Sequence, residues 1–280
     1  MSSLSLRRLS QRDQEALIEA IGLLEHPTLA ARVADVIGNP IEHALAHLPD
    51  QWSAKIGAVT QSALSKCLNV SIKTLDLTHD QPSSSRGFHK ALVATAGGLG
   101  GLGGFSTIAL ELPISTGVIF RSIADIARSH GEDVTSAECQ LACLEVFALG
   151  GPSDQDDGAE SGYFAIRLAL AQALREATRH FTRGVMVKES APVLTRLISL
   201  IAERFSVQLT EKVAAQLVPV LGALGGAAIN TIFIDHFQRM AEGHFTIRRL
   251  ERAYGERCIL DHYTQQLRVL RLERAQFTDK

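Results

Sequence analysis

A twenty-residue apolar run from Ala91 to Leu110, ALVATAGGLGGLGGFSTIAL, constrains the fold of this chain more than any other stretch. It carries no charged residue and is long enough to cross a bilayer as a helix. Six of the eight residues from Gly97 to Gly104 are glycine, and each glycine costs a helix about 1 kcal/mol relative to alanine. The run must therefore lie in lipid, lie inside a protein core or form a loop.

The glycine spacing favours a helix that packs closely against a second helix. An i, i+4 pair of glycines clears one helix face, so that another backbone can approach. The run contains two such pairs, Gly97 with Gly101 and Gly100 with Gly104. The predicted partner is a second uncharged run, Leu217 to Ile234, which carries its own pair at Gly222 and Gly226.

A nucleotide-binding loop is the alternative interpretation of the glycines. Gly98, Gly100 and Gly103 formally match G-x-G-x-x-G, and Asp125 lies a little over twenty residues further on. A segment this rich in glycine matches the pattern easily by chance, and no repeated strand-helix-strand alternation follows it. The close-packed helix is therefore preferred.

Composition and charge narrow the class of protein. Few aromatic residues and many Ala and Leu favour helix, and a formal charge of -2 without a basic stripe argues against nucleic acid as a partner. The four cysteines form no Cys-x-x-Cys pair, and charges near the N-terminus break any signal peptide. We therefore expect a cytoplasmic protein with reduced core thiols.

The periodicity predicts helix after helix, with no convincing strand. Ser10 is expected to cap the helix at 10–25, and Thr135 or Ser136 the helix at 135–149. Gly131 is expected to end the helix at 114–130. Pro113 is expected to end or kink the glycine-rich helix, so that a hairpin follows. Polar loops are predicted at 78–86 and 150–162. The helices are expected at about 10–25, 27–38, 40–48, 52–70, 114–130, 135–149, 163–179, 192–205, 210–217 and, as a pair, 245–277.

The predicted architecture is all-α, a single multi-helix bundle around two glycine-rich apolar helices. An N-terminal helical segment, residues 1–80, is expected to pack on a helical domain of residues 81–280, the two forming one continuous fold. In the helix predicted at 135–149, Ser136 and the polar residues from Glu138 to Glu145 are assigned to a polar side, and the core side is assigned to Leu141, Leu144 and Phe147.

Several stretches of the chain resemble the EcsC family. They are ALVATAGGLGGLGGFSTIALELP, IFRSIADIARSHGED, FALGG, GYFAIR and LVPVLGALGGAAINTIFIDHFQRMAEGHFTIRRLERAYG, within about residues 88–255. The resemblance implies a bacterial protein from a family named for its neighbourhood with an ABC transporter operon. It implies no established activity, and therefore no catalytic residue.

Three clusters have metal-ligand chemistry, but each fits an ordinary structural role better. His43 and His47 are spaced i, i+4 without a third ligand, and Cys139 and Cys143 share this spacing but are typical of core packing. The third cluster is acidic and fails the EF-hand register, so it is interpreted as a solvated loop. Its members are Asp154, Asp156, Asp157 and Glu160. No metal site and no cofactor are assigned.

Three carboxylates adjoin the apolar helices, where an ionised group needs a partner. They are Glu111, Asp125 and Asp235, with Arg121, Arg128 and Arg239 as candidate partners. A charge at the end of a buried helix is the simpler interpretation. The candidate ligand-binding residues are these carboxylates and the paired glycines: Gly97, Gly100, Gly101, Gly104, Glu111, Asp125, Gly222, Gly226 and Asp235.

Three functions follow from these features. The favoured one is a membrane-associated or lipid-binding protein, cytoplasmic and peripheral to the inner face of the membrane, because the apolar runs exceed what a soluble core needs. The second is a hydrolase or metal enzyme, with the three carboxylates converging near His130 or His236. The third is a structural partner of a transporter or other membrane complex. No nucleophile elbow or other catalytic motif is visible.

Overall fold

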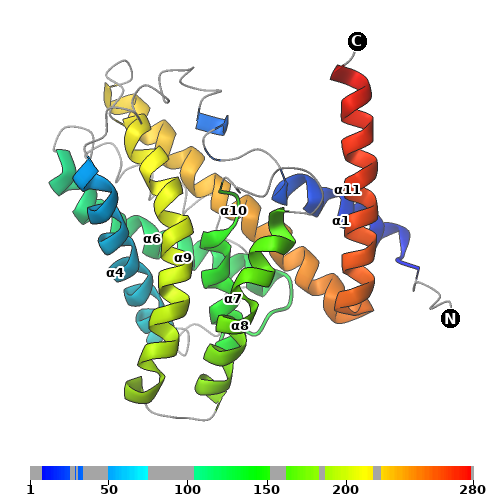
Figure 1. The fold of residues 1–280 in the computed structure, drawn as a ribbon, viewed down its shortest axis with the longest axis horizontal. Coiled ribbons are helices and arrows are strands. Elements are labelled where there is room, and N and C mark those ends of the chain that lie inside the picture. The colour runs from blue at the N-terminus through cyan, green and yellow to red at the C-terminus, as the bar shows by residue number, and fades with distance from the viewer. Residues whose placement is uncertain are drawn as a thin grey trace.

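The computed structural model describes residues 8–25, 29, 31–33, 50–74, 104–151, 162–182, 187–216 and 222–278. Within these ranges the regular elements are all helices, which confirms the all-α prediction (Figure 1). The elements are α1 (Gln11–Leu24), α4 (Asp50–Thr74), α6 (Gly104–Ser129), α7 (Ala137–Glu145), the short 3-10 helix η3 (Val146–Ala148), α8 (Gly162–Thr182), α9 (Val187–Gln216), α10 (Gly222–Tyr254) and α11 (Glu256–Thr278).

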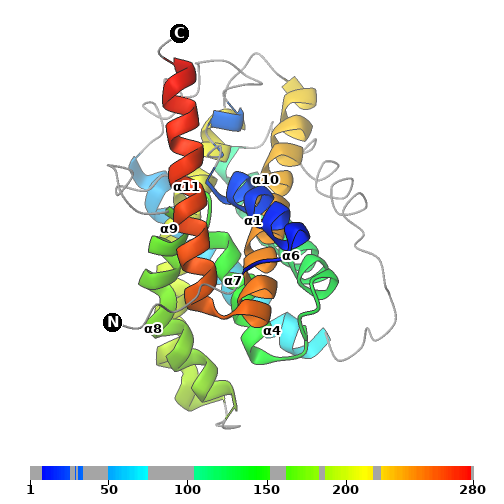
Figure 2. The same ribbon diagram turned by 90° about the vertical axis from the view of Figure 1, so that its right-hand side faces the viewer.

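Helix α10 runs through the middle of the molecule and contacts α1, α6, α9, η3 and α11 (Figures 1 and 2). Its aromatic residues lie in the core, where Phe237 contacts Phe147 of η3 and Phe205 of α9 at ring-centroid distances of 5.3 and 5.4 Å. Helix α11 stands at the edge, with the C-terminus at its tip (Figures 1 and 2). The fold is therefore built on α10.

Helix α1 forms as the sequence predicts and packs on α10. The Ser10 hydroxyl accepts a hydrogen bond from the Asp13 N–H and caps the helix, while Leu17 and Leu24 are buried. At Gly243 the two helices come so close that an added Cβ would lie 2.7 Å from Leu24. Glycine thus permits a close helix contact here, at a position that the sequence analysis did not single out.

Helix α6 corrects one sequence prediction, because it continues through Pro113 to Ser129 as a single helix. The expected helix end and hairpin at Pro113 were wrong, and the alternative of a kink there stays a prediction. Proline removes one backbone hydrogen bond at a cost of about 3 kcal/mol, but α6 packs along its length against α4 and α10, and such packing outweighs a local preference. The buried hydroxyls of Ser115 and Thr116 both donate to the Leu112 carbonyl.

The turn after α6 is held against α10. Gly131 has φ of 77° and ends the helix as predicted, and the Glu132 N–H donates to the Ala127 carbonyl. The Glu132 carboxylate then accepts from Arg248 and from Arg252, both on α10. The His-Gly-Glu-Asp segment therefore serves as a corner that fixes α6 and α7 on the central helix.

The next helices partly match their predicted bounds. Ser136 caps α7, as one of the two predicted caps. Helix α9 contains Pro192 and spans the two helices predicted at 192–205 and 210–217. Helix α10 extends past Phe245 to Tyr254. Gly255, with φ of 95°, separates α10 from α11. The helical pair predicted at 245–277 is therefore present, but its first member is the end of α10 and not a separate helix. Helix α6 contains the end of the first apolar run, and α10 contains most of the second run. The two helices contact each other.

Other predictions fall on residues outside the described ranges. These are the nucleotide-loop glycines Gly98 and Gly103, the histidines His43 and His47, the acidic cluster at 154–160, the loop at 78–86 and most of the helices predicted at 27–48. They remain predictions, as does the division of the chain at residue 80.

We predict that Gly243→Ala lowers the free energy of unfolding by about 1–3 kcal/mol. The new methyl group would meet the Leu24 side chain at 2.7 Å and the Ala20 carbonyl oxygen at 3.2 Å. Gly117→Ala in α6 is the matched control, since nothing lies within 4 Å of its Cβ position. It should be neutral or stabilising by up to about 1 kcal/mol. Urea denaturation measures both, and equal stabilities would contradict the close contact.

Candidate functional site

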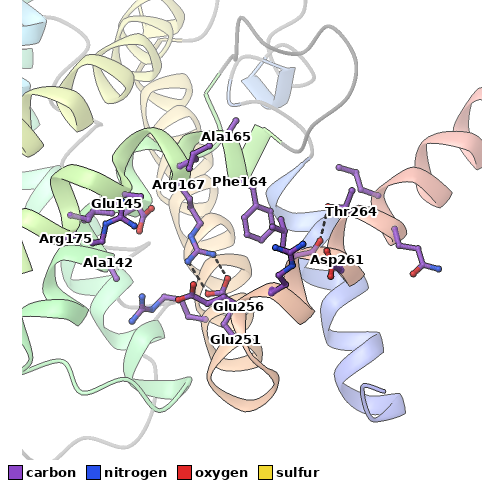
Figure 3. A pocket seen from close by; sticks show the side chains of 18 of the residues that line it. Ala142, Glu145, Phe164, Ala165, Arg167, Arg175, Glu251, Glu256, Asp261 and Thr264 are labelled. Atoms are coloured by element: carbon purple, nitrogen blue, oxygen red, sulfur yellow. Dashed lines mark hydrogen bonds and ion pairs between the residues drawn. The ribbon is translucent and has the colours of Figure 1, made fainter. Parts of the chain in front are cut away.

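A groove of about 1450 Å³ lies between α8 and α11, with α7 and the end of α10 contributing to its wall (Figure 3). Leu141, Phe164 and Leu168 form part of an apolar lining. Two leucines on its sides are unusually exposed, Leu168 at 76% and Leu272 at 66%. An apolar surface of this kind favours an apolar ligand or partner.

Arginines are the main charged residues of the groove: seven line it, against five carboxylates. Four of the arginines are exposed and, within the described ranges, form no ion pair; they are Arg175, Arg257, Arg268 and Arg271. A guanidinium group without a carboxylate partner can bind phosphate or carboxylate in bidentate fashion. The groove thus combines apolar surface with available positive charge.

Arg167 crosses the centre of the groove and ties α8 to α10 (Figure 3). Its Nη1 and Nη2 donate to the two carboxylate oxygens of Glu251 at 2.6 and 3.1 Å. The guanidinium also lies 5.5 Å from the ring centres of Tyr163 and Phe164. Arg167 is therefore a structural cation, neutralised by its own carboxylate.

Glu145, the last residue of α7, lines the groove although it is only 4% exposed. Its carboxyl group makes no hydrogen bond within the part of the chain that the structure describes; the nearest polar contact is His244 Nε2, 3.8 Å from Oε2. Burial raises the pKa of Glu145 to about 7, against the lowering effect of Arg167 and Arg248. A buried carboxyl without a hydrogen-bond donor costs stability unless something else supplies that donor.

His244 continues this polar cluster into the core. Its Nδ1 shares a hydrogen bond of 3.0 Å with the Tyr163 hydroxyl, and the imidazole is fully buried. Burial, followed by the charges of Arg167 and Arg248, lowers the His244 pKa well below its ordinary value. The imidazole is therefore neutral at physiological pH.

A second buried polar cluster joins α6, α9 and α10 away from the groove. Lys212 Nζ donates to Glu111 Oε1 at 2.8 Å, Asn230 Nδ2 donates to the same oxygen at 3.2 Å, and the ammonium lies 4.8 Å from the Phe233 ring centre. Burial lowers the Lys212 pKa, and Glu111 opposes that shift. The cluster is a satisfied ion pair inside the bundle.

Comparison with known families now identifies the chain. Residues 8–250 match the model of the EcsC protein family. The protein belongs to the EcsC family. No curated protein and no solved structure matches it. The matched range starts before α1, so the N-terminal helix is part of the family match, which extends further than the resemblance seen at 88–255.

The three carboxylates singled out from the sequence of this EcsC-family protein pair with three different cations. Glu111 contacts Lys212, Asp235 contacts Arg32, and Asp125 lies 4.0 Å from Arg128. Arg128 was among the predicted partners, whereas Lys212 and Arg32 were not predicted. None of the three carboxylates lines the groove.

The two histidines proposed for an enzyme site lie in different surroundings. His130 contacts Glu242 of α10 at 3.0 Å, and both side chains are half-buried. His236 is buried beside Gly150, whose φ is 73° and whose added Cβ would lie 2.6 Å from the imidazole. Burial lowers its pKa to about 3. Among the described residues, no group of three or more His, Cys, Asp or Glu side chains could hold a metal ion.

The paired glycines remain candidates only. Gly97, Gly100 and Gly101 lie outside the described ranges, Gly104 begins α6, Gly222 begins α10, and Gly226 follows one turn later.

No described helix is long and apolar enough to cross a membrane. Cys139 and Cys143 are buried, as core cysteines should be.

Sequence reasoning missed the residues of the groove and of the polar cluster beside it. Tyr163 and Arg167 belong to GYFAIR, and His244 and Glu251 to the long C-terminal segment, so the family resemblance marked those stretches without indicating that they meet. Glu145 was assigned to a solvent-facing side of its helix, and that assignment was wrong. Helices α4, α6 and α8 pack around this helix. Glu145 at its C-terminal end is buried as a result, whereas Glu138 at its start stays exposed.

We predict that Glu145→Gln makes the protein more stable than the wild type at pH 8, and that this advantage disappears at pH 4. A carboxyl with a pKa near 7 in the folded chain and near 4.5 in the unfolded chain stabilises the fold fully below pH 4.5. This contribution is lost as the pH rises through 7 and amounts to about 3 kcal/mol. Chemical denaturation at several pH values measures the difference between the two proteins. A difference independent of pH would show that Glu145 does not titrate in this range.

We predict that Lys212→Met lowers the free energy of unfolding by about 3–5 kcal/mol, because it leaves the Glu111 carboxylate buried without its counter-charge. The double variant Glu111→Gln, Lys212→Met should recover at least half of this loss, since it removes both charges. Guanidinium denaturation measures the cycle. Additive losses would show that the 2.8 Å contact does not couple the two residues.

Proposed function

We propose that this EcsC-family protein binds an amphipathic lipid in the groove between α8 and α11. The lipid has an acyl chain and an anionic group, phosphate or carboxylate. The observation that carries the proposal is that exposed leucines and arginines without ion pairs line one groove. This deepens the membrane-associated function favoured by the sequence, but it places the ligand in the groove instead of between the glycine-rich helices.

The apolar part of the groove supplies the binding free energy. Apolar surface removed from water contributes about 25 cal/mol per Å², and Leu168 and Leu272 have most of their surface available for burial. The groove exceeds the roughly 300–1,000 Å³ of a typical small-molecule pocket. A long chain fills such a space better than a compact ligand does.

The arginines supply selectivity for an anionic group. Arg257, Arg268 and Arg271 belong to α11 and Arg175 to α8, so positive charge lies on both sides of the apolar lining. Near an anionic membrane each such charge contributes about 1 kcal/mol of attraction. A protein with this surface would act at the inner face of the membrane.

The test is calorimetric titration of the purified protein with lysophosphatidylglycerol and with monoacylglycerol of the same chain length. Native mass spectrometry of protein prepared without detergent would detect co-purified lipid. We expect the phosphate-bearing lipid to bind and monoacylglycerol to bind at least tenfold more weakly. Leu168→Gln should weaken binding of both lipids about tenfold, because it removes buried apolar contact. The joint change Arg268→Gln, Arg271→Gln should weaken only lysophosphatidylglycerol.

Two variants outside the groove serve as controls. Ile114 is 62% exposed on α6 and Arg121 is exposed on the same helix, and neither lines the groove. Ile114→Gln and Arg121→Gln should leave both affinities unchanged. Absence of binding by any lipid would refute the proposal, and equal losses in the control variants would place binding elsewhere. A groove that binds only a protein segment would favour the structural-partner function.

A further inference from the structure

One feature of the groove is unexplained by an acyl chain and an anionic group alone. Glu145 lines the groove and is only 4% exposed, and its carboxyl group accepts no hydrogen bond from a described side chain, since His244 Nε2 lies 3.8 Å away. Apolar chains and phosphates cannot supply a donor. A ligand that fills the groove without one would bury an unsatisfied carboxyl group more deeply.

We propose that Glu145 binds a primary ammonium group of the lipid, so that the ligand is an aminophospholipid carrying an acyl chain, a phosphate and an –NH₃⁺ group. The inference rests on the proposed function of the groove. It adds the head-group chemistry, and Glu145 as the residue that determines specificity.

The charges around Glu145 favour an ammonium over a hydroxyl group. Both flanking arginines already have carboxylate partners: Arg167 pairs with Glu251, and Arg248 pairs with Glu132 at 2.9 Å. Their charges are thus largely neutralised, and neither donates a hydrogen bond to Glu145. A hydroxyl would satisfy the hydrogen bond but leave a buried negative charge, whereas an ammonium satisfies both.

An arginine suited to the phosphate lines the same groove. Figure 3 shows Arg175 of α8 and Glu145 of α7 on the same side of Arg167. Arg175 is exposed and forms no ion pair with any described residue. We assign the ammonium of the head group to Glu145 and the phosphate to the arginines that line the groove without an ion pair among the described residues. The acyl chain then extends along the leucines toward α11.

The proton on Glu145 gives the interaction a defined pH dependence. The pKa of this carboxyl is near 7, so the ammonium should bind more tightly at pH 8 than at pH 6, where Glu145 is largely neutral. The groups that face it are Tyr163 and Arg167 from α8 and His244, Arg248 and Glu251 from α10. His244 and Tyr163 stay neutral over this range and the arginines stay charged, because burial lowers the pKa of His244 and raises that of Tyr163.

The experiment compares lysophosphatidylethanolamine with lysophosphatidylcholine of the same chain length, by calorimetric titration at pH 6 and pH 8. The two head groups carry the same charges, but only the first has N–H donors. We expect the wild type to prefer lysophosphatidylethanolamine at least tenfold at pH 8 and less at pH 6. Glu145→Gln should reduce the preference to about threefold or below and abolish its pH dependence.

The control is Glu203→Gln, because Glu203 is an exposed carboxylate on α9 that does not line the groove. This variant should keep the wild-type preference. Comparing two ligands on the wild-type protein tests the proposal even if Glu145→Gln does not fold. Equal binding of both lysolipids would overturn the role of Glu145 while leaving the lipid-binding groove intact. If neither these lysolipids nor lysophosphatidylglycerol binds, the proposed function itself fails.

Discussion

The burial of α10 is the constraint on which the rest of this structure depends. This helix carries polar side chains that are almost fully removed from water, and a buried polar group needs a hydrogen-bond partner. Asn230 donates to Glu111 of α6, Gln238 donates to Ser122 of the same helix, and His244 pairs with Tyr163 of α8. These bonds fix the position of α10 along and around its neighbours, which apolar contacts alone would fix less specifically.

The groove follows from how α10 ends. Gly255 adopts a positive φ, and α11 then departs at the edge of the bundle (Figure 2). Arg167 and Glu251 hold α8 against the last turns of α10, so that an apolar surface remains between α8 and α11. The charged groups of Arg167 and Glu251, which join α8 to α10, also act on Glu145 at the end of α7. The site is thus a consequence of helix geometry at the end of the central element, and no loop motif is needed to build it.

Much of the local structure could be predicted from the sequence. Ser10 and Ser136 cap their helices and Gly131 ends one, because each of these features depends on neighbours a few residues away. Pro113 shows where this reasoning fails. Its effect on the helix depends on α4 and α10, which are remote in the chain, and their packing keeps α6 continuous.

The sequence by itself determined that this chain is helical, which faces of several helices are apolar, and which family it belongs to, since periodicity, caps and motifs are properties of short segments. Only the tertiary structure decided that Glu145 is buried and that Arg167, His244 and Glu251 gather around it. These groups come from three helices, and the environment of a carboxyl is set by whatever packs over it. Burial, unlike helicity, is a property of the assembled bundle.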